Sequence, residues 1–482
     1  MWYLNKDVLF MIFEELSHND KKSLHSCLLV NRTWCTTAMP ILWRDPSQFF
    51  MTENSMNMLF NVIFLHLSEE SKNNLKDQGI NNSFIEKYQR PLFNYINFWK
   101  YLDLDFLEEI ILSKNIKNSN MSIVKNEMLR LFINRNTKFL HLYIRGDFDY
   151  QLHLIPGAEY CFSELESFHC CAEVDQNILE GLARICKLIK KFRFDNVHYC
   201  TDGTGIFKLI EVQKKLNNVS FIGHFNNLYD LIVSDESFYK SLEESLIKHT
   251  DTVQYLKMSW TPITRILSCF VNLISLNIDS NFSNKLYWNN FENVKFSFLK
   301  ILKVRRVPSN FLVNLIKSTI GTLSEICMNY DGIDSKRLFQ TIYQNCPNLR
   351  YLDLSLVDNI NLFIPELESL LINCQLLDGL IIDVQDTFDT FNWNELFIIL
   401  IRSSSINLFK FKFYSIWMIK LEEIDLFLDN WENKNPILLE ISYLICNEEE
   451  KLNNLLKEYE IKGIIKKYLI DDGFTSRNFE WV

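Results

Sequence analysis

Apolar and polar residues alternate in a short pattern that recurs through the second half of the chain. The clearest copy is "CPNLRYLDLS" (346–355), in which leucines follow the order L-x-x-L-x-L and the last two alternate with polar residues. Alternation with a period of two predicts a strand with one buried face. Four further copies share the frame, and they read LISLNI (273–278), LKILKV (299–304), LSEICM (323–328) and LDGLII (377–382).

Weaker copies extend the pattern in both directions along the chain. Together they give twelve expected strand centres, which are Leu140, Phe168, Phe192, Ile222, Leu256, Leu276, Leu302, Ile326, Leu352, Leu380, Phe411 and Ile441. The mean step is about 27 residues, which falls inside the range of roughly 20–29 residues that is typical of leucine-rich repeats.

Segments between the expected strands have the spacing of amphipathic helices. In "NFLVNLIKSTI" (310–320) the apolar residues share one helical face, and Asn310 is the expected N-cap. In "IPELESLLINC" (364–374) Pro365 falls in the first helical turn. Strand and helix in alternation predict an α/β fold, an irregular leucine-rich-repeat solenoid with a parallel inner sheet, outer helices and a C-terminal helical cap over residues 134–482.

The first 45 residues predict three short helices. In the first helix one apolar stripe has helical spacing and consists of Leu9, Ile12, Phe13 and Leu16. Asn19 is the expected cap of the second helix and Asn31 that of the third, which should end before Pro40. So small a unit with this much apolar surface cannot form a robust core alone, so either another protein or the following domain should cover part of it.

This N-terminal stretch resembles an F-box, the short helical motif that docks on a Skp-type adaptor. The family's pattern is an apolar helix ending in F-x-x-L, then V-x-[KR]-x-W, then L-W; Val30, Arg32 and Trp34 supply the middle element. Asn5 stands where the family commonly has proline, and an asparagine can cap the same helix. The residues to which the resemblance assigns adaptor docking are Leu4, Val8, Leu9, Ile12, Phe13, Leu16, Val30, Trp34, Leu42 and Trp43.

The patterns together predict three segments: an F-box-like module (1–45), a helical connecting region (46–133) and the repeats (134–482). The resemblance implies a non-enzymatic substrate receptor of a cullin-type ubiquitin ligase, with a Skp-type adaptor, and through it a cullin, as partners. One alternative is a leucine-rich scaffold whose N-terminal helices cap the solenoid; another is an enzyme or GTPase regulator built on a repeat fold.

The target of such a receptor is not identified by the sequence. On each expected strand the residues between the buried positions should face outward. There they could either bind a target or simply be solvated. The outward residues assigned to target binding are Lys257, Asn277, Asp279, Lys303, Arg305, Asp353 and Asp383. Both charge signs occur among them, so they imply no simple ligand charge.

Composition argues against several other classes of protein. The 50 basic and 60 acidic residues give a formal net charge of -10, which provides no footprint for nucleic acid. The longest apolar runs are too short to span a membrane. Lys6 and Asp7 interrupt the N-terminal apolar stretch, which excludes a signal-peptide core and favours a cytoplasmic or nuclear location.

The sequence contains no constellation typical of an enzyme, a metal site or a cofactor site. The twelve cysteines form no C-x-x-C pair, the histidines show no H-E-x-x-H spacing, and G-x-S-x-G is absent. Cys186, Cys346 and Cys374 each precede an expected strand centre by six residues, which indicates small buried side chains at helix-to-strand turns. We therefore expect reduced thiols and no catalytic, metal or cofactor site.

Overall fold

The computed structural model describes residues 4–49, 51–78, 91–114, 116, 118–146, 148–200, 202–223, 236–280, 288, 295–330, 334–356, 364–385, 390–431, 434–445 and 448–471. The chain divides into two compact units, one of Met1–Asn217 with His224–Ser245 and one of Asn218–Gly223 with Leu246–Val482. The segment boundaries expected after residues 45 and 133 stay predictions.

The first unit begins with the three expected helices, α1 (Lys6–Asn19), α2 (Lys21–Cys27) and α3 (Arg32–Leu42). Asn5 caps α1, where its side-chain oxygen accepts the Asp7 backbone N–H at 3.2 Å, and Asn31 caps α3. The cap expected at Asn19 was wrong, because α1 runs through that residue. The cap of α2 is Asp20, whose carboxylate accepts the Ser23 N–H.

The expected end of the third helix was also wrong, since α3 continues through Pro40 to Leu42. A proline inside a helix removes one backbone hydrogen bond. The last turn persists here because Ile41 and Leu42 are buried in the core of the three helices, and the Trp43 N–H still donates to the Met39 carbonyl at 3.0 Å.

In the described residues of the rest of the first unit, helices are interspersed with four strands. In chain order its elements are η1 (Pro46–Gln48), α4 (Glu53–Leu65), α5 (Glu69–Asp77), η3 (Tyr95–Phe98), β1 (Tyr101–Asp103), α6 (Leu104–Leu112), α7 (Asn118–Phe132), β2 (His141–Ile144), η4 (Leu152–Leu154), α8 (Ala158–Cys161), β3 (Ser167–Cys171), α9 (Gln176–Ile185), β4 (Lys191–Asp195), η5 (Val197–Tyr199), α10 (Thr204–Glu211) and most of α11 (Glu236–Ile247). The connecting region that was expected to be helical (46–133) therefore also contains a strand, β1.

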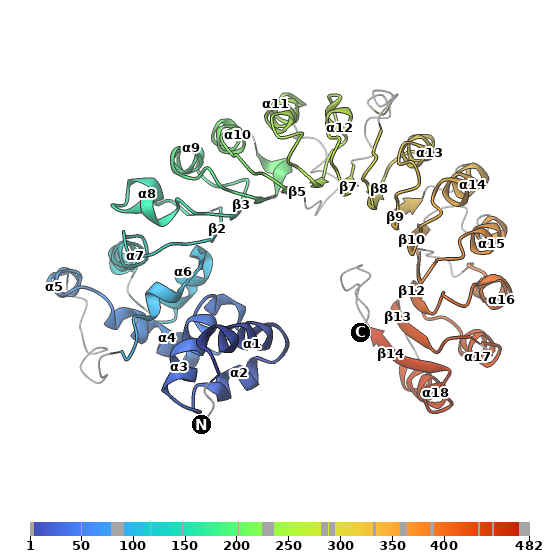
Figure 1. Ribbon diagram of the computed structural model, residues 1–482, viewed down its shortest axis with the longest axis horizontal. Coiled ribbons are helices and arrows are strands. Elements are labelled where there is room, and N and C mark those ends of the chain that lie inside the picture. Colours follow the sequence, from blue (N-terminus) through green and yellow to red (C-terminus); the bar gives the residue numbers. More distant parts are fainter. Residues whose placement is uncertain are drawn as a thin grey trace. The chain divides into compact units, whose positions relative to one another are not determined.

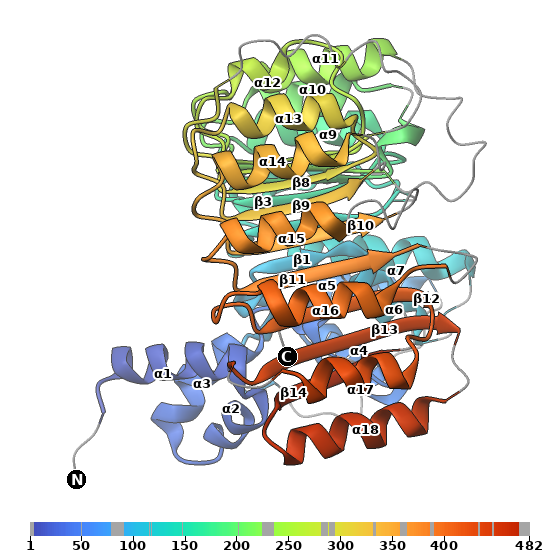
Figure 2. The ribbon, with the colours of Figure 1, turned by 90° about the vertical axis from the view of Figure 1, so that its right-hand side faces the viewer.

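The second unit continues the alternation. Its elements are β5 (Asn218–Ile222), β6 (Tyr255–Met258), α12 (Ile266–Cys269), β7 (Ser275–Asp279), β8 (Ile301–Arg305), α13 (Ser309–Lys317), β9 (Glu325–Tyr330), α14 (Ser335–Asn345), β10 (Tyr351–Leu356), α15 (Ile364–Asn373), β11 (Gly379–Val384), α16 (Trp393–Ser403), β12 (Lys410–Trp417), α17 (Leu421–Asp429), β13 (Ile437–Ile445), α18 (Glu449–Ile461) and β14 (Ile465–Asp471). Helices α13 to α17 all cover the same side of the strands (Figure 1), and Figure 2 shows them stacked in chain order.

Within each unit the strands are parallel, and strands that follow one another in the chain lie side by side. One backbone pattern recurs from strand to strand, in which a carbonyl just before a strand accepts two amides of the next repeat. The Lys300 carbonyl accepts the Ser324 and Glu325 amides at 2.9 and 3.0 Å, and the Ser324 carbonyl then accepts the Arg350 and Tyr351 amides. This parallel ladder with a helical outer layer confirms the predicted α/β leucine-rich-repeat fold.

The register places the expected apolar residues in one row. Leu352 is fully buried and pairs with Ile326 on β9 and Leu380 on β11, and the row continues from Leu302 on β8 to Phe411 on β12. Because no single repeat can enclose its own apolar face, these aligned side chains form a core that runs across neighbouring repeats.

Three expected strand centres were wrong. The residues that occupy the row are Leu142 instead of Leu140, Val219 instead of Ile222, and Leu439 instead of Ile441. The shift of two residues at Ile441 keeps the same face, so both candidates there are buried, whereas the shift of three at Ile222 selects a half-buried residue on the other face.

The turns between helices and strands follow the sequence in part. Pro365 lies in the first turn of α15 as expected, but α13 begins at Ser309 and not after Asn310, because Pro308 precedes it in extended conformation. Cys186, Cys346 and Cys374 directly follow helices and are buried. The sequence predicted a C-terminal helical cap, whereas in the described chain the last helix, α18, is followed by a further strand, β14.

We predict that Leu352→Asp unfolds the central repeats. A carboxylate at this fully buried position has no cation beside it in the apolar row, and its burial costs on the order of several kcal/mol. Thermal melting and limited proteolysis of the full chain measure the effect. Ile372→Asp on the exposed side of α15 is the matched control and should melt like the parent chain. An unchanged melt for Leu352→Asp would contradict the register.

Candidate functional site

The first candidate surface lies on the three N-terminal helices, α1 to α3, which we call the N-terminal module. Its core contains seven buried residues, which are Leu9, Phe13, Leu24, Cys27, Ala38, Ile41 and Leu42. Leu16, Trp34 and Trp43 pack against this core and are partly buried. Six of the ten residues assigned to adaptor docking therefore belong to the module's own packing.

The other four assigned residues, Leu4, Val8, Ile12 and Val30, are exposed. Val8 and Ile12 are 42% and 41% exposed, and Met11, which the sequence assignment missed, is 72% exposed. Residues spaced by three and four on a helix share one face. Val8, Met11 and Ile12 thus form an apolar face of α1 outside the core, which we call the exposed α1 face.

Exposed apolar residues also lie outside this face, and of these only Val30 was anticipated. Phe10 is exposed on α1, and Leu29 and Val30 are exposed in the turn before α3. The signal that could have found Met11 is its spacing from Val8, since a helix that is apolar on two sides has one face too many for a core this small.

The two tryptophans have different neighbours. Trp34 packs edge-on against Phe13, with ring centroids 5.3 Å apart, so its contact stays inside the N-terminal module. Trp43 packs against Tyr95 of η3, with ring centroids 4.3 Å apart. Trp43 therefore joins the module to the segment that leads into β1.

Arg44 makes a second connection between the N-terminal module and β1. Its guanidinium forms a two-pronged ion pair with Glu14 of α1, in which Nη1 donates to Oε2 at 3.0 Å. Its backbone carbonyl accepts the Lys100 and Tyr101 amides at 2.8 and 3.3 Å. In the same way, one carbonyl accepts two successive amides between neighbouring repeats. Arg44 therefore makes the first of these backbone connections, ahead of β1.

Aromatic side chains that the sequence did not single out follow the strands of the first unit. Tyr101 stacks on His141 with ring centroids 3.8 Å apart, and the ring centroids of Tyr143 and His169 are 4.5 Å apart. Burial alone would raise the pKa of Asp195, but hydrogen bonds from His169 and Arg193 outweigh it and hold this pKa at about 2. The carboxylate therefore stays ionised beside the stacked rings.

The second candidate surface is a hollow of about 240 Å³ on strands β6 to β10 of the second unit, which we call the strand hollow. Six of the seven residues assigned to target binding line it: Lys257, Asn277, Asp279, Lys303, Arg305 and Asp353. Asp383 does not line the hollow; it is buried on β11 and accepts the Ser355 hydroxyl at 2.5 Å.

The register explains why the six residues meet. Lys257 on β6, Asn277 on β7 and Lys303 on β8 follow one another in register across the strands. Two positions further along, Asp279 of β7 is in register with Arg305 of β8. Side chains two residues apart on a strand point to the same face, so two rows of polar residues share the hollow. Asn329 and Ser355, on β9 and β10, extend the second row.

Several charges in the strand hollow are already paired within the fold. Lys303 Nζ lies 2.7 Å from Glu325 Oε1, and the Arg306 guanidinium holds Asp279, with Nε 3.1 Å from Oδ1. The Cys327 thiol donates to Asp353. Burial, and next the charge of Asp353, hold the pKa of this thiol well above its ordinary value, so Cys327 stays protonated.

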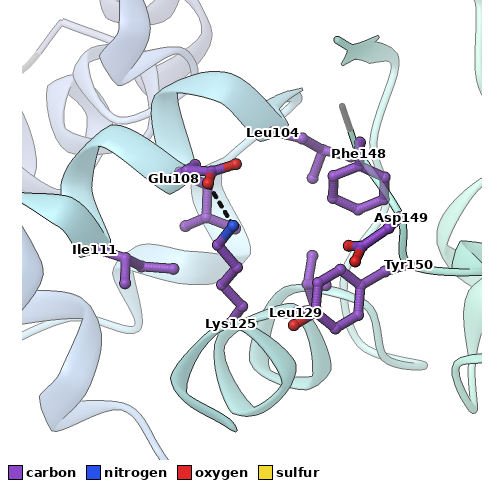
Figure 3. A pocket seen from close by; sticks show the side chains of 9 residues that line it. Leu104, Glu108, Ile111, Lys125, Leu129, Phe148, Asp149 and Tyr150 are labelled. Carbon is purple, nitrogen blue, oxygen red and sulfur yellow. Dashed lines mark hydrogen bonds and ion pairs between the residues drawn. The ribbon is translucent and has the colours of Figure 1, made fainter. Parts of the chain in front are cut away.

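A third pocket, between α6 and α7, is too small to serve as a ligand site (Figure 3). Its volume is about 20 Å³, which is close to the space that one water needs. Lys125 and Glu108 form an ion pair in its wall. Within the described residues no group of histidine, cysteine and carboxylate side chains is arranged to hold a metal ion, and none of their helices is long and apolar enough to cross a membrane.

A scan of protein-family models and a search of curated proteins gave no match for this chain. Among solved structures it is similar to the Rad7 and Elc1 complex of yeast, with 14% identity and a TM-score of 0.43 over 99% of this chain and 96% of that chain. It is also similar to the leucine-rich repeat-containing protein LegL7 from Legionella pneumophila, with 11% identity and a TM-score of 0.34 over 68% of this chain and 90% of that chain.

We predict that Trp43→Ala loosens the connection between the N-terminal module and β1, whereas Trp34→Ala does not. Truncating a fully buried tryptophan costs about 3–5 kcal/mol, and the half-buried Trp43 should cost less. Hydrogen exchange of the Lys100 and Tyr101 amides reports local opening at this junction. Exchange there should accelerate in Trp43→Ala only, and equal rates in both variants would contradict separate roles for the two tryptophans.

Proposed function

We propose that this chain is a non-enzymatic substrate receptor of a cullin-type ubiquitin ligase. In this proposal the N-terminal module docks on a Skp-type adaptor, and the strand face of the repeats holds the target protein. The observation that carries the proposal is that α1 has two apolar faces, one buried in the module and one exposed at Val8, Met11 and Ile12.

The exposed α1 face is large for a module of this size. Single exposed apolar residues are normal on protein surfaces, but contiguous ones mark interaction sites. Full burial of one such side chain contributes about 1.5–3 kcal/mol, and each 1.4 kcal/mol changes an affinity about tenfold. An adaptor that covered this face would therefore gain affinity from three neighbouring side chains at once.

The residues that resemble the F-box pattern then divide into two roles. Val8, Ile12 and the missed Met11 would touch the adaptor, whereas Leu9 and Phe13 would hold α1 in position from within the core. A substitution of a core residue would disturb docking through the fold, and a substitution on the exposed face would disturb docking alone.

Such a receptor would act through proximity. One surface holds the ligase and another holds the target, which raises the effective concentration of the target near the ubiquitin-loaded enzyme. The proposal assigns no bond-making step to this chain. Arg44 joins the N-terminal module to β1 through both its side chain and its backbone, which either role requires.

The alternative is a repeat scaffold in which the N-terminal module serves only as a cap. The bonding of Arg44 at the first ladder step favours a capping role, since solenoids need their terminal repeats covered. Capping uses the module's core, Trp43 and Arg44, and leaves the exposed α1 face without a purpose. The two proposals therefore differ in what they expect from that face.

We predict that the double variant Val8→Glu, Ile12→Glu of the full chain binds a purified Skp-type adaptor more than tenfold more weakly than the parent chain does. The reason is that two side chains that would be buried apolar contacts become charged. Titration calorimetry measures the affinity, and the melting temperature should not change because both positions are exposed.

The matched control is the double variant Leu376→Glu, Ile398→Glu, which places the same charges at positions 41% and 45% exposed in the repeats. It should bind the adaptor like the parent chain. Absence of adaptor binding by the parent chain at tens of micromolar, or equal binding by the Val8→Glu, Ile12→Glu variant, would favour the scaffold.

A further inference from the structure

The charged side chains of the strand hollow differ in whether they already have partners within the fold. Asp279 is held by Arg306, and Asp353 is buried and accepts the Cys327 thiol. Lys303 forms an ion pair with Glu325 and keeps part of its side chain exposed. The Asp279 carboxylate is therefore already paired with a cation, and the Asp353 carboxylate is withdrawn from the surface by burial.

Arg305 differs from every other charged residue of the hollow. It ends β8, is exposed, and its guanidinium has no hydrogen-bond or ion-pair partner among the described residues. A guanidinium presents five N–H donors in a rigid fork that matches a carboxylate. Arg305 is therefore available to bind an anion in the hollow.

Neutral donors lie on both sides of Arg305. Asn277 is on β7, in register with Lys303, and Asn329 on β9 directly follows Met328, which is in register with Val304. Both asparagines line the hollow, and each side-chain amide can donate two hydrogen bonds. Lys257 lies in the same cross-strand row as Asn277 and Lys303 and also lines the hollow.

We propose that the strand hollow binds an acidic side chain of the target, with its carboxylate on Arg305 and with Asn277 and Asn329 as flanking donors. The inference rests on the proposed function, because it names the chemistry of the segment that the receptor would hold. The volume of about 240 Å³ supports it, since pockets for small molecules occupy about 300–1,000 Å³ and this hollow suits one side chain of a peptide.

The charges also explain selectivity. A basic side chain in the hollow would be repelled by Arg305, and the Asp279 carboxylate that could attract it is already paired with Arg306. The chain as a whole has a formal net charge of -10, so the attraction of an acidic segment is local to this face. Binding should therefore weaken as salt screens the site.

The test uses the full chain and three labelled peptides of equal length, in which six glutamates, six glutamines or six lysines are flanked by glycine and serine. Fluorescence anisotropy should show binding of the glutamate peptide and at least tenfold weaker binding of the other two. Arg305→Gln should weaken binding of the glutamate peptide at least tenfold. Arg305→Lys should weaken this binding less, because a lysine keeps the positive charge but lacks the bidentate donors of a guanidinium. Lys317→Gln, which removes an exposed charge from α13, should bind like the parent chain.

Equal binding of the three peptides, or unchanged binding by Arg305→Gln with an unchanged melt, would overturn the inference. Adaptor affinity measured on the same preparations separates this inference from the proposed function. Arg305→Gln should leave adaptor binding unchanged, and Val8→Glu, Ile12→Glu should leave peptide binding unchanged. A chain that binds the adaptor without preferring glutamate keeps the receptor role and loses this site, and the reverse result keeps the site and loses the receptor.

Discussion

The whole architecture depends on one recurring constraint, which is that each repeat must share its apolar row with the next. Leu352 is enclosed only because Ile326 and Leu380 lie in register on either side. The same constraint orients the polar residues, because a strand that turns Leu352 inward must turn Asp353 to the opposite face. The strand hollow is thus a consequence of the core register, and a shift of one residue in any of its strands would dissolve it.

The N-terminal module takes part in this ladder through Arg44, whose carbonyl bonds to β1 as each later repeat bonds to its neighbour. Trp43 reinforces the junction from the side of η3. These contacts use residues at the end of α3, and they leave Val8, Met11 and Ile12 on α1 exposed. The module is therefore fixed to β1 at one end and exposed on another face.

The central repeats could be predicted because leucine alternation is strong there, whereas β1 has only three residues and offers too short a pattern to detect. On α1 the sequence could not separate contact residues from core residues, since Val8 and Ile12 are as apolar as Leu9 and Phe13 and only packing distinguishes them. In the strand hollow the sequence supplied the outward residues but not their pairing. That Arg306 and not Arg305 holds Asp279 depends on backbone geometry after β8 that no spacing rule encodes.

The central claim is that the exposed α1 face is covered when the adaptor binds, and the oxidation rate of Met11 tests it most directly. Met11 is highly exposed on that face, and Met58, exposed on α4, is an internal reference. Methionine oxidation to the sulfoxide follows exposure and can be measured by mass spectrometry on the full chain. With saturating Skp-type adaptor, Met11 should become several-fold slower to oxidise while Met58 keeps its rate. An unchanged rate at Met11 in the presence of bound adaptor would contradict the account.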